Sequence, residues 1–202
     1  MAYAYRHPFL YPESTKTKMS TLSQHYQLNC RGSLLNLDAR TKIMGILNIT
    51  PDSFSDGGRY FNLDGAVAQA ELLIEEGADI IDVGGESTRP AGLYGTGADA
   101  ISLKEEIRRT IPVIEKIAAR TDRPISIDTT KAEVVRQALQ AGASIVNDIS
   151  AMRFDPEMSQ TIAASGVPII LMHMQGTPKT MQKNPTYKNL IAEIKSFLKE
   201  RH

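Results

Sequence analysis

Short apolar runs recur along the chain, and each of them ends in polar residues. The runs are continuous rather than alternating, which is typical of strands that are covered on both faces of a parallel sheet. Before three of them a helical pattern stops at a glycine, in the stretches EEGADIIDVGG, LQAGASIVNDIS and ASGVPIILMHM. This repeat predicts strands that alternate with helices. The predicted strands are residues 43–49, 80–85, 125–129, 145–149 and 168–173.

Local signals predict where the helices begin and end. Ser102 and Thr130 are each followed three residues later by a glutamate, which is the pattern of a capping box. Asp155 precedes a proline that suits the first turn of a helix, and a last helix is predicted over residues 190–200. The glycines that follow the helical patterns suit the left-handed position at which many helices end. They are Gly77, Gly142 and Gly166.

The alternation predicts an α/β fold with a parallel sheet, either an open doubly wound sheet or a (β/α)8 TIM barrel. An open sheet gathers its site at one switch point, whereas a barrel collects polar groups from several strands at one mouth. Every predicted strand ends in such groups, which favours the barrel. A full barrel takes roughly 250 residues, so this chain of 202 residues is expected to cover about the first five βα units. The strand-end residues are Asn48, Glu86, Asp128, Asn147, Asp148 and His173.

The flanking sequence and the composition narrow the class of protein. Residues 1–25 have no clear period and are interpreted as an N-terminal extension, and residues 26–202 as the barrel domain, which opens with a hairpin around Arg31 and Gly32. Lys plus Arg and Asp plus Glu both number 23, so the charge does not indicate a nucleic-acid partner. No apolar run approaches the roughly 20 residues of a membrane helix. The single cysteine, Cys30, fits a reducing compartment, and we expect a cytoplasmic protein.

The loop after the first predicted strand, NITPDSFSDGG, is unusually polar. It supplies the amide oxygen of Asn48 and the carboxylates of Asp52 and Asp56. Oxygen ligands of this kind suit Mg²⁺, which takes few protein ligands and shares the others with phosphate and water. A capped turn is the alternative, because Pro-Asp and Asp-Gly pairs are common in turns.

The loop after the second predicted strand reads GGESTRP. The hydroxyls of Ser87 and Thr88 and the guanidinium of Arg89 form a candidate anion site, because Arg binds phosphate oxygens bidentately. Pairing of Arg89 with Glu86 is the alternative. Because the two polar loops would lie side by side at the barrel mouth, a site for diphosphate and Mg²⁺ explains both of them better.

Two further strand-end residues suit a nitrogen heterocycle. The carboxylate of Asp128 can accept parallel bonds from a 2-amino group and the adjacent ring N–H, which is the edge of a pterin or a guanine-like ring. The amide of Asn147 fits an edge on which donors and acceptors alternate. A satisfied network between strand and loop stays open as the alternative. Met172 suits an apolar wall, whereas His173 is more simply a structural residue.

Five ordered stretches carry a family resemblance: MGILNITPDSFSDGG, ADIIDVGGESTRP, ISIDTTKAEV, ASIVNDIS and LMHMQGTPKTMQ. With them the chain resembles the dihydropteroate synthases, pterin-binding transferases of folate biosynthesis that have a (β/α)8 barrel and are sulfonamide targets. The resemblance implies that 4-aminobenzoate attacks the methylene carbon of (7,8-dihydropterin-6-yl)methyl diphosphate. The products are 7,8-dihydropteroate and diphosphate, in an SN1-like reaction with Mg²⁺.

The resemblance also implies roles for single residues. Asn48 would lie at the metal, and Asp56 and Arg89 would be the catalytic residues. Thr88 and Arg89 would bind the diphosphate, and Asp128 and Asn147 would bind the pterin. Ile149 and Met172 would form apolar walls around the pterin ring. Phe54 and Pro90, together with Asp56, would close over 4-aminobenzoate.

The resemblance covers only the earlier part of the family pattern. The family's later Asp-Pro-Gly, Ser-Arg-Lys and Arg-x-His motifs do not occur in this sequence. We therefore expect the intact protein to be the enzyme and a homodimer, and the 202-residue chain to be weakly active or inactive alone. Two alternatives stay open: a pterin-binding methyltransferase domain, which would not need the diphosphate loops, and a non-catalytic truncated paralogue.

Overall fold

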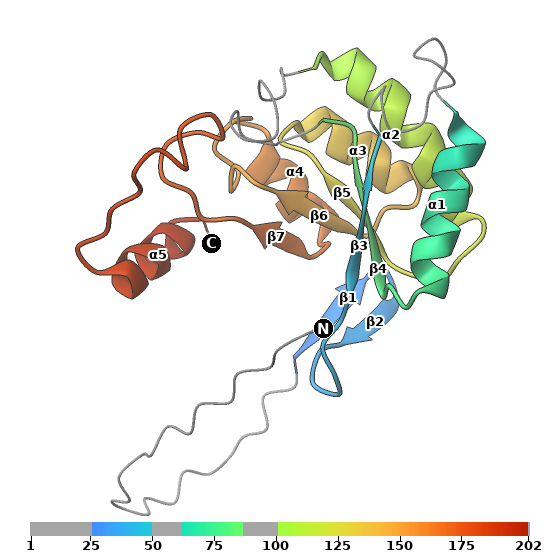
Figure 1. Cartoon of the computed structure of the whole chain (residues 1–202), viewed down its shortest axis with the longest axis horizontal. Helices are drawn as coiled ribbons and strands as arrows, with labels where there is room; N and C mark the ends of the chain where they lie inside the picture. Colours follow the sequence, from blue (N-terminus) through green and yellow to red (C-terminus); the bar gives the residue numbers. More distant parts are fainter. Residues whose placement is uncertain (1–25, 50–61, 87–100, 202) are drawn as a thin grey trace, which may run out of the picture.

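The computed structural model describes residues 26–49, 62–86 and 101–201. Strands and helices alternate along the chain after a short N-terminal hairpin (Figure 1). The strands are β1 (Gln27–Cys30), β2 (Ser33–Asn36), β3 (Met44–Asn48), β4 (Ile80–Gly84), β5 (Ile125–Asp128), β6 (Ile145–Asp148) and β7 (Ile169–Leu171). The helices are α1 (Leu63–Glu75), α2 (Leu103–Ala118), α3 (Ala132–Ala141), α4 (Met158–Ser165) and α5 (Leu190–Lys199).

The main sheet has five parallel strands in the order β3-β4-β5-β6-β7. Each strand pairs with the next one in the chain, and the order never reverses. A doubly wound sheet reverses its strand order at a switch point, whereas a barrel adds its strands in sequence. The strand order therefore confirms the barrel architecture, of which the described residues form an open part. Within these residues, no helix is both long and apolar enough to span a bilayer.

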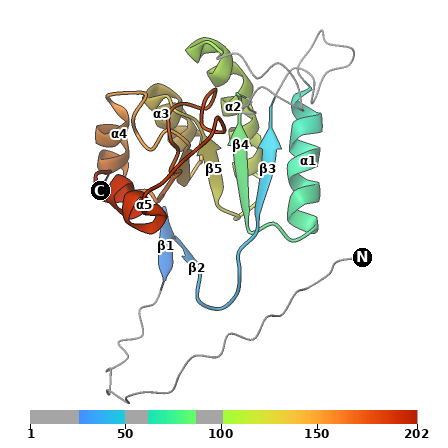
Figure 2. The ribbon, with the colours of Figure 1, turned by 60° about the vertical axis from the view of Figure 1, so that its left-hand side comes forward.

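One face of the sheet is packed against helices. Leu47, Val83, Ile127 and Val146 point to this face and are at most 1% exposed. α1 packs on β3 and β4, and α2 lies between α1 and α3. Figure 2 shows α1 running alongside β3 and β4, with the β1-β2 hairpin below the strands. Burial of these branched apolar side chains, at roughly 1.5 to 3 kcal/mol each, is the main source of stability in this layer.

On the opposite, inner face, the β1-β2 hairpin covers the amino-terminal ends of the central strands. Here the hairpin packs Cys30 and Leu35 against Ile80 and Ile145. Farther along the same face, the edge strands expose Ile46 (65%) and Ile170 (37%). The expectation that both faces of the strands are covered therefore holds for the central strands β4 and β5, and is wrong for the edge strands β3 and β7 among the described residues.

The hairpin is confirmed where the sequence predicted it. Arg31 and Gly32 connect β1 to β2 with positive φ angles of 54° and 96°. This pair of left-handed residues matches the twist of a two-residue hairpin. The guanidinium of Arg31 also donates to the carbonyl of Leu139 in the last turn of α3. A cation is favourable at this end of a helix, so the contact fastens the hairpin to the barrel.

Most of the predicted helix signals are confirmed. The hydroxyl of Ser102 accepts a bond of 3.2 Å from the N–H of Glu105. The three glycines adopt the left-handed conformation after α1, α3 and α4, with φ of 106°, 117° and 66°. The capping box at Thr130 is wrong: α3 begins at Ala132, and the carboxylate of Asp155 accepts from the N–H of Ala132 at 2.7 Å. The other Asp155 oxygen accepts from the N–H of Glu157 ahead of α4, so one carboxylate supports both helices.

Candidate active site

The carboxyl ends of the strands bring polar side chains into one row on the inner face. Across the sheet, Asn48 is paired with Gly84, Gly84 with Asp128, and Asp128 with Asn147. Residues paired in parallel strands point to the same face of the sheet. The predicted gathering of Asn48, Asp128 and Asn147 is therefore confirmed.

Gly84 leaves open the space between two of these side chains. A Cβ atom at this position would lie 3.5 Å from Asn48 Oδ1 and 3.5 Å from Asp128 Oδ2. Both oxygens therefore lie next to the position on β4 where any residue other than glycine would have its side chain. The absence of a side chain there creates a small polar recess between an amide and a carboxylate.

Asp128 has an unusual acidity. Burial raises the pKa of its carboxyl to about 7, and repulsion by neighbouring carboxylates adds to the rise. These carboxylates come from β4, α2, β6 and the turn after β4. They are Asp82, Glu106, Asp148 and Glu86. A carboxyl poised near neutrality can change its charge when a ligand with N–H donors arrives, which is typical of a functional site.

Asp82 lies below this row, in the middle of β4. It is 4% exposed, and its Oδ2 accepts a bond of 3.0 Å from Nδ2 of Asn147. Burial raises the pKa of the Asp82 carboxyl, and hydrogen bonds from the Ser126 hydroxyl and from Asn147 offset part of the rise.

A buried ion-pair network lies beside the row. The ammonium of Lys131 donates to Glu86 Oε2 at 2.8 Å and to Glu106, which is 1% exposed. Thr129 Oγ1 donates to the other oxygen of Glu106 at 2.5 Å. Arg109 donates to the carbonyl of Gly85 at 3.0 Å. The network thus ties the end of β4 to α2 and to the start of α3.

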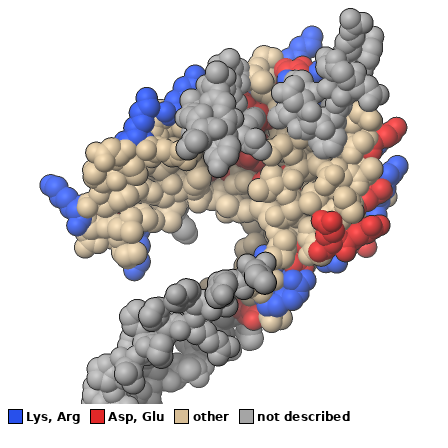
Figure 3. Space-filling model, in the orientation of Figure 1, with Lys and Arg blue, Asp and Glu red and all other residues tan. Residues whose placement is uncertain are grey.

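Figure 3 shows Asp and Glu residues at the surface near the upper edge of the molecule, where β3 and β4 end in the same view of Figure 1. Glu86 contributes an acidic group at this end of β4, where the sequence left open a pairing with Arg89. Among the described residues its partner is Lys131.

Two other strand-end residues have structural roles. The oxygens of Asp148, which is fully buried, accept from the backbone N–H groups of Ser150 and Met152 at 2.7 and 2.8 Å. The ring of His173 packs edge-on against Phe197, with 4.8 Å between the ring centroids. His173 is thus held among aromatic side chains, in agreement with its interpretation as a structural residue.

The remaining predicted site residues divide into two groups. Ile149 and Met172 are half-buried and follow β6 and β7 directly, at the same end of the sheet as the polar row. The others lie outside the described residues: Phe54, Asp56, Thr88, Arg89 and Pro90.

Sequence reasoning missed Asp82, Lys131 and Glu106. The signal for Asp82 is an acidic residue inside the apolar run ADIIDVGG. Alternation along β4 places it on the same face as Gly84. Glu106 and Lys131 look like ordinary helix-surface charges in sequence, and only the tertiary fold places them together.

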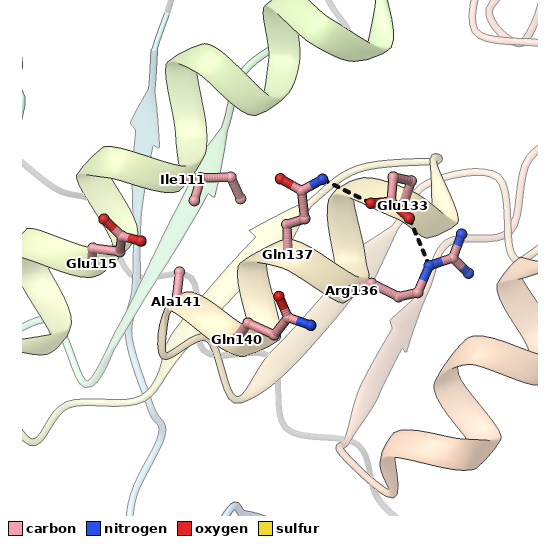
Figure 4. Close-up of a pocket in the computed structure, with 7 residues that line it drawn as sticks. All are labelled: Ile111, Glu115, Glu133, Arg136, Gln137, Gln140 and Ala141. Atoms are coloured by element: carbon pink, nitrogen blue, oxygen red, sulfur yellow. Dashed lines mark hydrogen bonds and ion pairs between the residues drawn. The ribbon is translucent and has the colours of Figure 1, made fainter.

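A separate groove lies on the outside of the barrel, between α2 and α3 (Figure 4). Ile111 and Glu115 of α2 face Gln137 and Ala141 of α3 across it. One of its two carboxylates, Glu133, is already bound by Arg136 and Gln137 of the same helix, at 2.8 and 2.7 Å. The groove lies on the opposite side of the sheet from the polar row, and the charges of Glu133 and Arg136 are paired within α3.

The side-chain oxygen of Asn48 could bind Mg²⁺ only if a bound ligand and water supply most of the other oxygen atoms. The described residues hold no group of three or more His, Cys, Asp or Glu side chains that could bind a metal ion. The side chain of Asn48 is exposed and makes no hydrogen bond to another described residue. One amide oxygen suits Mg²⁺, which usually completes its octahedron with phosphate oxygens and water.

Comparisons with known proteins agree with this arrangement. The sequence model of the family described as pterin binding enzyme matches residues 44–202. The chain belongs to the pterin-binding enzyme family. The resemblance to dihydropteroate synthases is thereby confirmed.

Relatives in this family are similar over most of this chain. The dihydropteroate synthase of Synechocystis sp. is 53% identical over 165 residues, which are 82% of this chain and 55% of that protein. A structure of Xanthomonas albilineans dihydropteroate synthase with 4-aminobenzoic acid has 47% identity and a TM-score of 0.73, covering 87% of this chain and 59% of that one. Another, in complex with 7,8-dihydropteroate, has 43% identity and a TM-score of 0.71, covering 87% and 58%. The chain thus spans somewhat more than half the length of these relatives.

Proposed function

We propose that the intact protein is a dihydropteroate synthase of folate biosynthesis. The observation that carries this proposal is the row of Asn48, Gly84, Asp128 and Asn147 at one end of the sheet. It combines a metal-type oxygen with hydrogen-bonding groups for a heterocycle. The relatives from Xanthomonas albilineans, one with 4-aminobenzoic acid and one with 7,8-dihydropteroate, support the same assignment.

The pterin would bind at the Asp128 end of the row. In its ionised form Asp128 accepts two parallel bonds, which matches a 2-amino group next to a ring N–H. Asn147 supplies one donor and one acceptor to the neighbouring edge. Ile149 and Met172 would cover the faces of the ring as apolar walls.

The diphosphate would bind at the Asn48 end. When bound there, Mg²⁺ neutralises the negative charge that grows on the leaving group. Thr88 would hydrogen-bond the diphosphate, and Arg89 would bind it through its guanidinium fork. Phe54, Asp56 and Pro90 would order 4-aminobenzoate and face the reacting carbon.

In the reaction, the bond between the pterin methylene carbon and the diphosphate oxygen breaks before the new bond is complete. The electron pair leaves with diphosphate, and the carbon becomes cationic. The amine nitrogen of 4-aminobenzoate then forms the C–N bond and loses one proton to solvent. Asp56 would stabilise the cationic centre, and Arg89 would stabilise the departing anion.

Assembly and location remain part of the proposal. We expect the intact protein to be a homodimer that acts in the cytoplasm. Its substrates are two small molecules, pterin diphosphate and 4-aminobenzoate, with neither nucleic acid nor membrane as a partner.

The experiment is calorimetric titration of the intact protein with (7,8-dihydropterin-6-yl)methyl diphosphate, with and without Mg²⁺, followed by turnover with 4-aminobenzoate. We expect binding that strengthens with Mg²⁺, and release of diphosphate with each dihydropteroate formed. Binding of pterin without any effect of diphosphate or Mg²⁺ would instead support a methyltransferase-type pterin domain. Binding without turnover would support a non-catalytic paralogue. In the same assay, a near-normal rate from the 202-residue chain alone would contradict our expectation that it is weakly active or inactive.

A further inference from the structure

We propose that Asp82 is a positioning residue, which holds the side-chain amide of Asn147 in the orientation that the heterocycle requires. The inference rests on the proposed function, because it takes Asn147 as a ligand-binding residue. It concerns a residue of β4 that does not itself lie in the polar row.

The geometry couples the two side chains across a strand. Asn147 lies on β6 and Asp82 on β4, and the bond of 3.0 Å from Nδ2 to Oδ2 passes over β5. The backbone of Asn147 is fixed as well, since its carbonyl accepts from the N–H of Thr129 at 3.0 Å. With the backbone held, the remaining freedom of Asn147 is rotation of the amide.

That rotation is what Asp82 controls. An ionised carboxylate only accepts hydrogen bonds, whereas the two ends of an amide are a donor and an acceptor. With the amide turned over, its oxygen would face the oxygen of Asp82 at hydrogen-bond distance, and two acceptors repel each other. The carboxylate therefore selects the orientation in which the amide nitrogen points toward β4.

The consequence for a ligand is a fixed order of donor and acceptor. In this orientation the Oδ1 atom and the second N–H of Asn147 are left for a ligand, and Asn147 is paired with Asp128 in the same row. A ring edge with the matching alternation can bind. The reversed amide would present the same groups in the opposite order and would leave buried polar groups unpaired.

The burial of Asp82 supports a role beyond packing. The residue is 4% exposed, and the groups that offset the burial of its carboxylate are the Ser126 hydroxyl on the adjacent strand and the amide of Asn147. Burying a carboxylate with only neutral hydrogen-bond partners is costly. An apolar side chain at this position would avoid the cost but could not orient Asn147.

The first test compares two variants of the intact protein, Asp82→Asn and the matched control Ser126→Ala. Ser126 pairs with Asp82 across the sheet and hydrogen-bonds the same carboxylate, but only the first variant removes the carboxylate that Asn147 contacts. The probe is 6-hydroxymethyl-7,8-dihydropterin, titrated by calorimetry. We expect about tenfold weaker binding for Asp82→Asn, as for loss of a hydrogen bond to a charged group, and binding within about twofold of wild type for Ser126→Ala.

The second measurement is the ¹⁵N-resolved side-chain amide signal of Asn147 in the ligand-free protein. We expect one proton of the pair to be shifted downfield and slow to exchange, and this signature to vanish in Asp82→Asn but persist in Ser126→Ala. A purely structural role would not distinguish the two variants in this way. If Asp82→Asn fails to fold, the wild-type signal still decides, because two unshifted, freely exchanging protons would overturn the inference.

The outcomes separate this inference from the proposed function. Absence of pterin binding by the wild-type protein overturns the proposed function. Binding by the wild type together with an equal Kd for Asp82→Asn leaves that function standing and overturns the role of Asp82.

Discussion

The ammonium of Lys131 contacts the carboxylate of Glu106, a side chain that is only 1% exposed. Removing one partner of a buried ion pair leaves an uncompensated charge, which typically costs several kcal/mol. We therefore expect Lys131→Met to lower the free energy of unfolding by about 3 kcal/mol, measured by urea denaturation. The double variant Lys131→Met with Glu106→Gln should recover part of this loss, because it removes the stranded charge.

The control for this prediction is a surface ion pair of similar length. Lys116 contacts Asp64 at 2.7 Å, but the two side chains are 42% and 84% exposed. Solvent screens such a pair, so its contribution to stability is small. Lys116→Met should therefore change stability far less than Lys131→Met, and equal effects of the two substitutions would contradict the importance of burial.

Two adjacent glycines at the end of β4 should respond differently to alanine. At Gly84 the new Cβ would have ordinary contacts of 3.5 Å with Asn48 and Asp128, whereas at Gly85 it would lie 2.8 Å from Thr110 Cγ2. Gly84→Ala should fold normally but weaken pterin binding, because it fills the recess in the row. Gly85→Ala should lower the melting temperature, since overpacking costs about 1 to 3 kcal/mol. Pterin binding is measured by calorimetry and the melting temperature by thermal unfolding. Normal binding by Gly84→Ala together with a lowered melting temperature would contradict the placement of the recess.

The fold was largely predictable because local patterns encode it. Apolar runs and glycines such as Gly142 place strands and helix ends without any long-range information, and Ser102 caps its helix through a contact three residues away. Thr130 shows where such reasoning fails. The bond that caps α3 comes from Asp155, 23 residues farther along the chain, and a local motif carries no trace of it.

The candidate site was predictable only in part. Asn48, Asp128 and Asn147 could be grouped because parallel strands end at one edge of the sheet. Asp82 and Lys131 could not, because their roles depend on contacts across β5 and with α2. An acidic residue within an apolar strand, such as Asp82, indicates a buried polar group. Which residue it contacts depends on how the strands are arranged in space, and the sequence pattern does not encode this.

Asp128 should make the stability of this chain depend on pH. Its pKa in the folded chain is about 7, above the value of about 3.9 in an unfolded chain. Between these values the folded state binds more protons, so stability falls as the pH rises from about 4 to about 7, and stays level above that range. A shift of about three pKa units at roughly 1.4 kcal/mol each gives at most about 4 kcal/mol.

Asp128→Asn should therefore be more stable than wild type at pH 8 and equal to it at pH 4 in urea denaturation. Parallel pH profiles for the two chains would contradict the raised pKa.

Replacing Asn48 should weaken the effect of Mg²⁺ on diphosphate binding and should not change binding of the pterin ring. Its amide is exposed and faces the recess at Gly84, so Asn48→Ala removes an oxygen ligand without disturbing the core. In the intact protein we expect Mg²⁺ to strengthen binding of the pterin diphosphate about tenfold less in this variant than in wild type, as for loss of one charge-assisted contact. Binding of 6-hydroxymethyl-7,8-dihydropterin, which lacks the diphosphate, should not change. An equal loss for both ligands in calorimetry would place Asn48 at the pterin rather than at the metal.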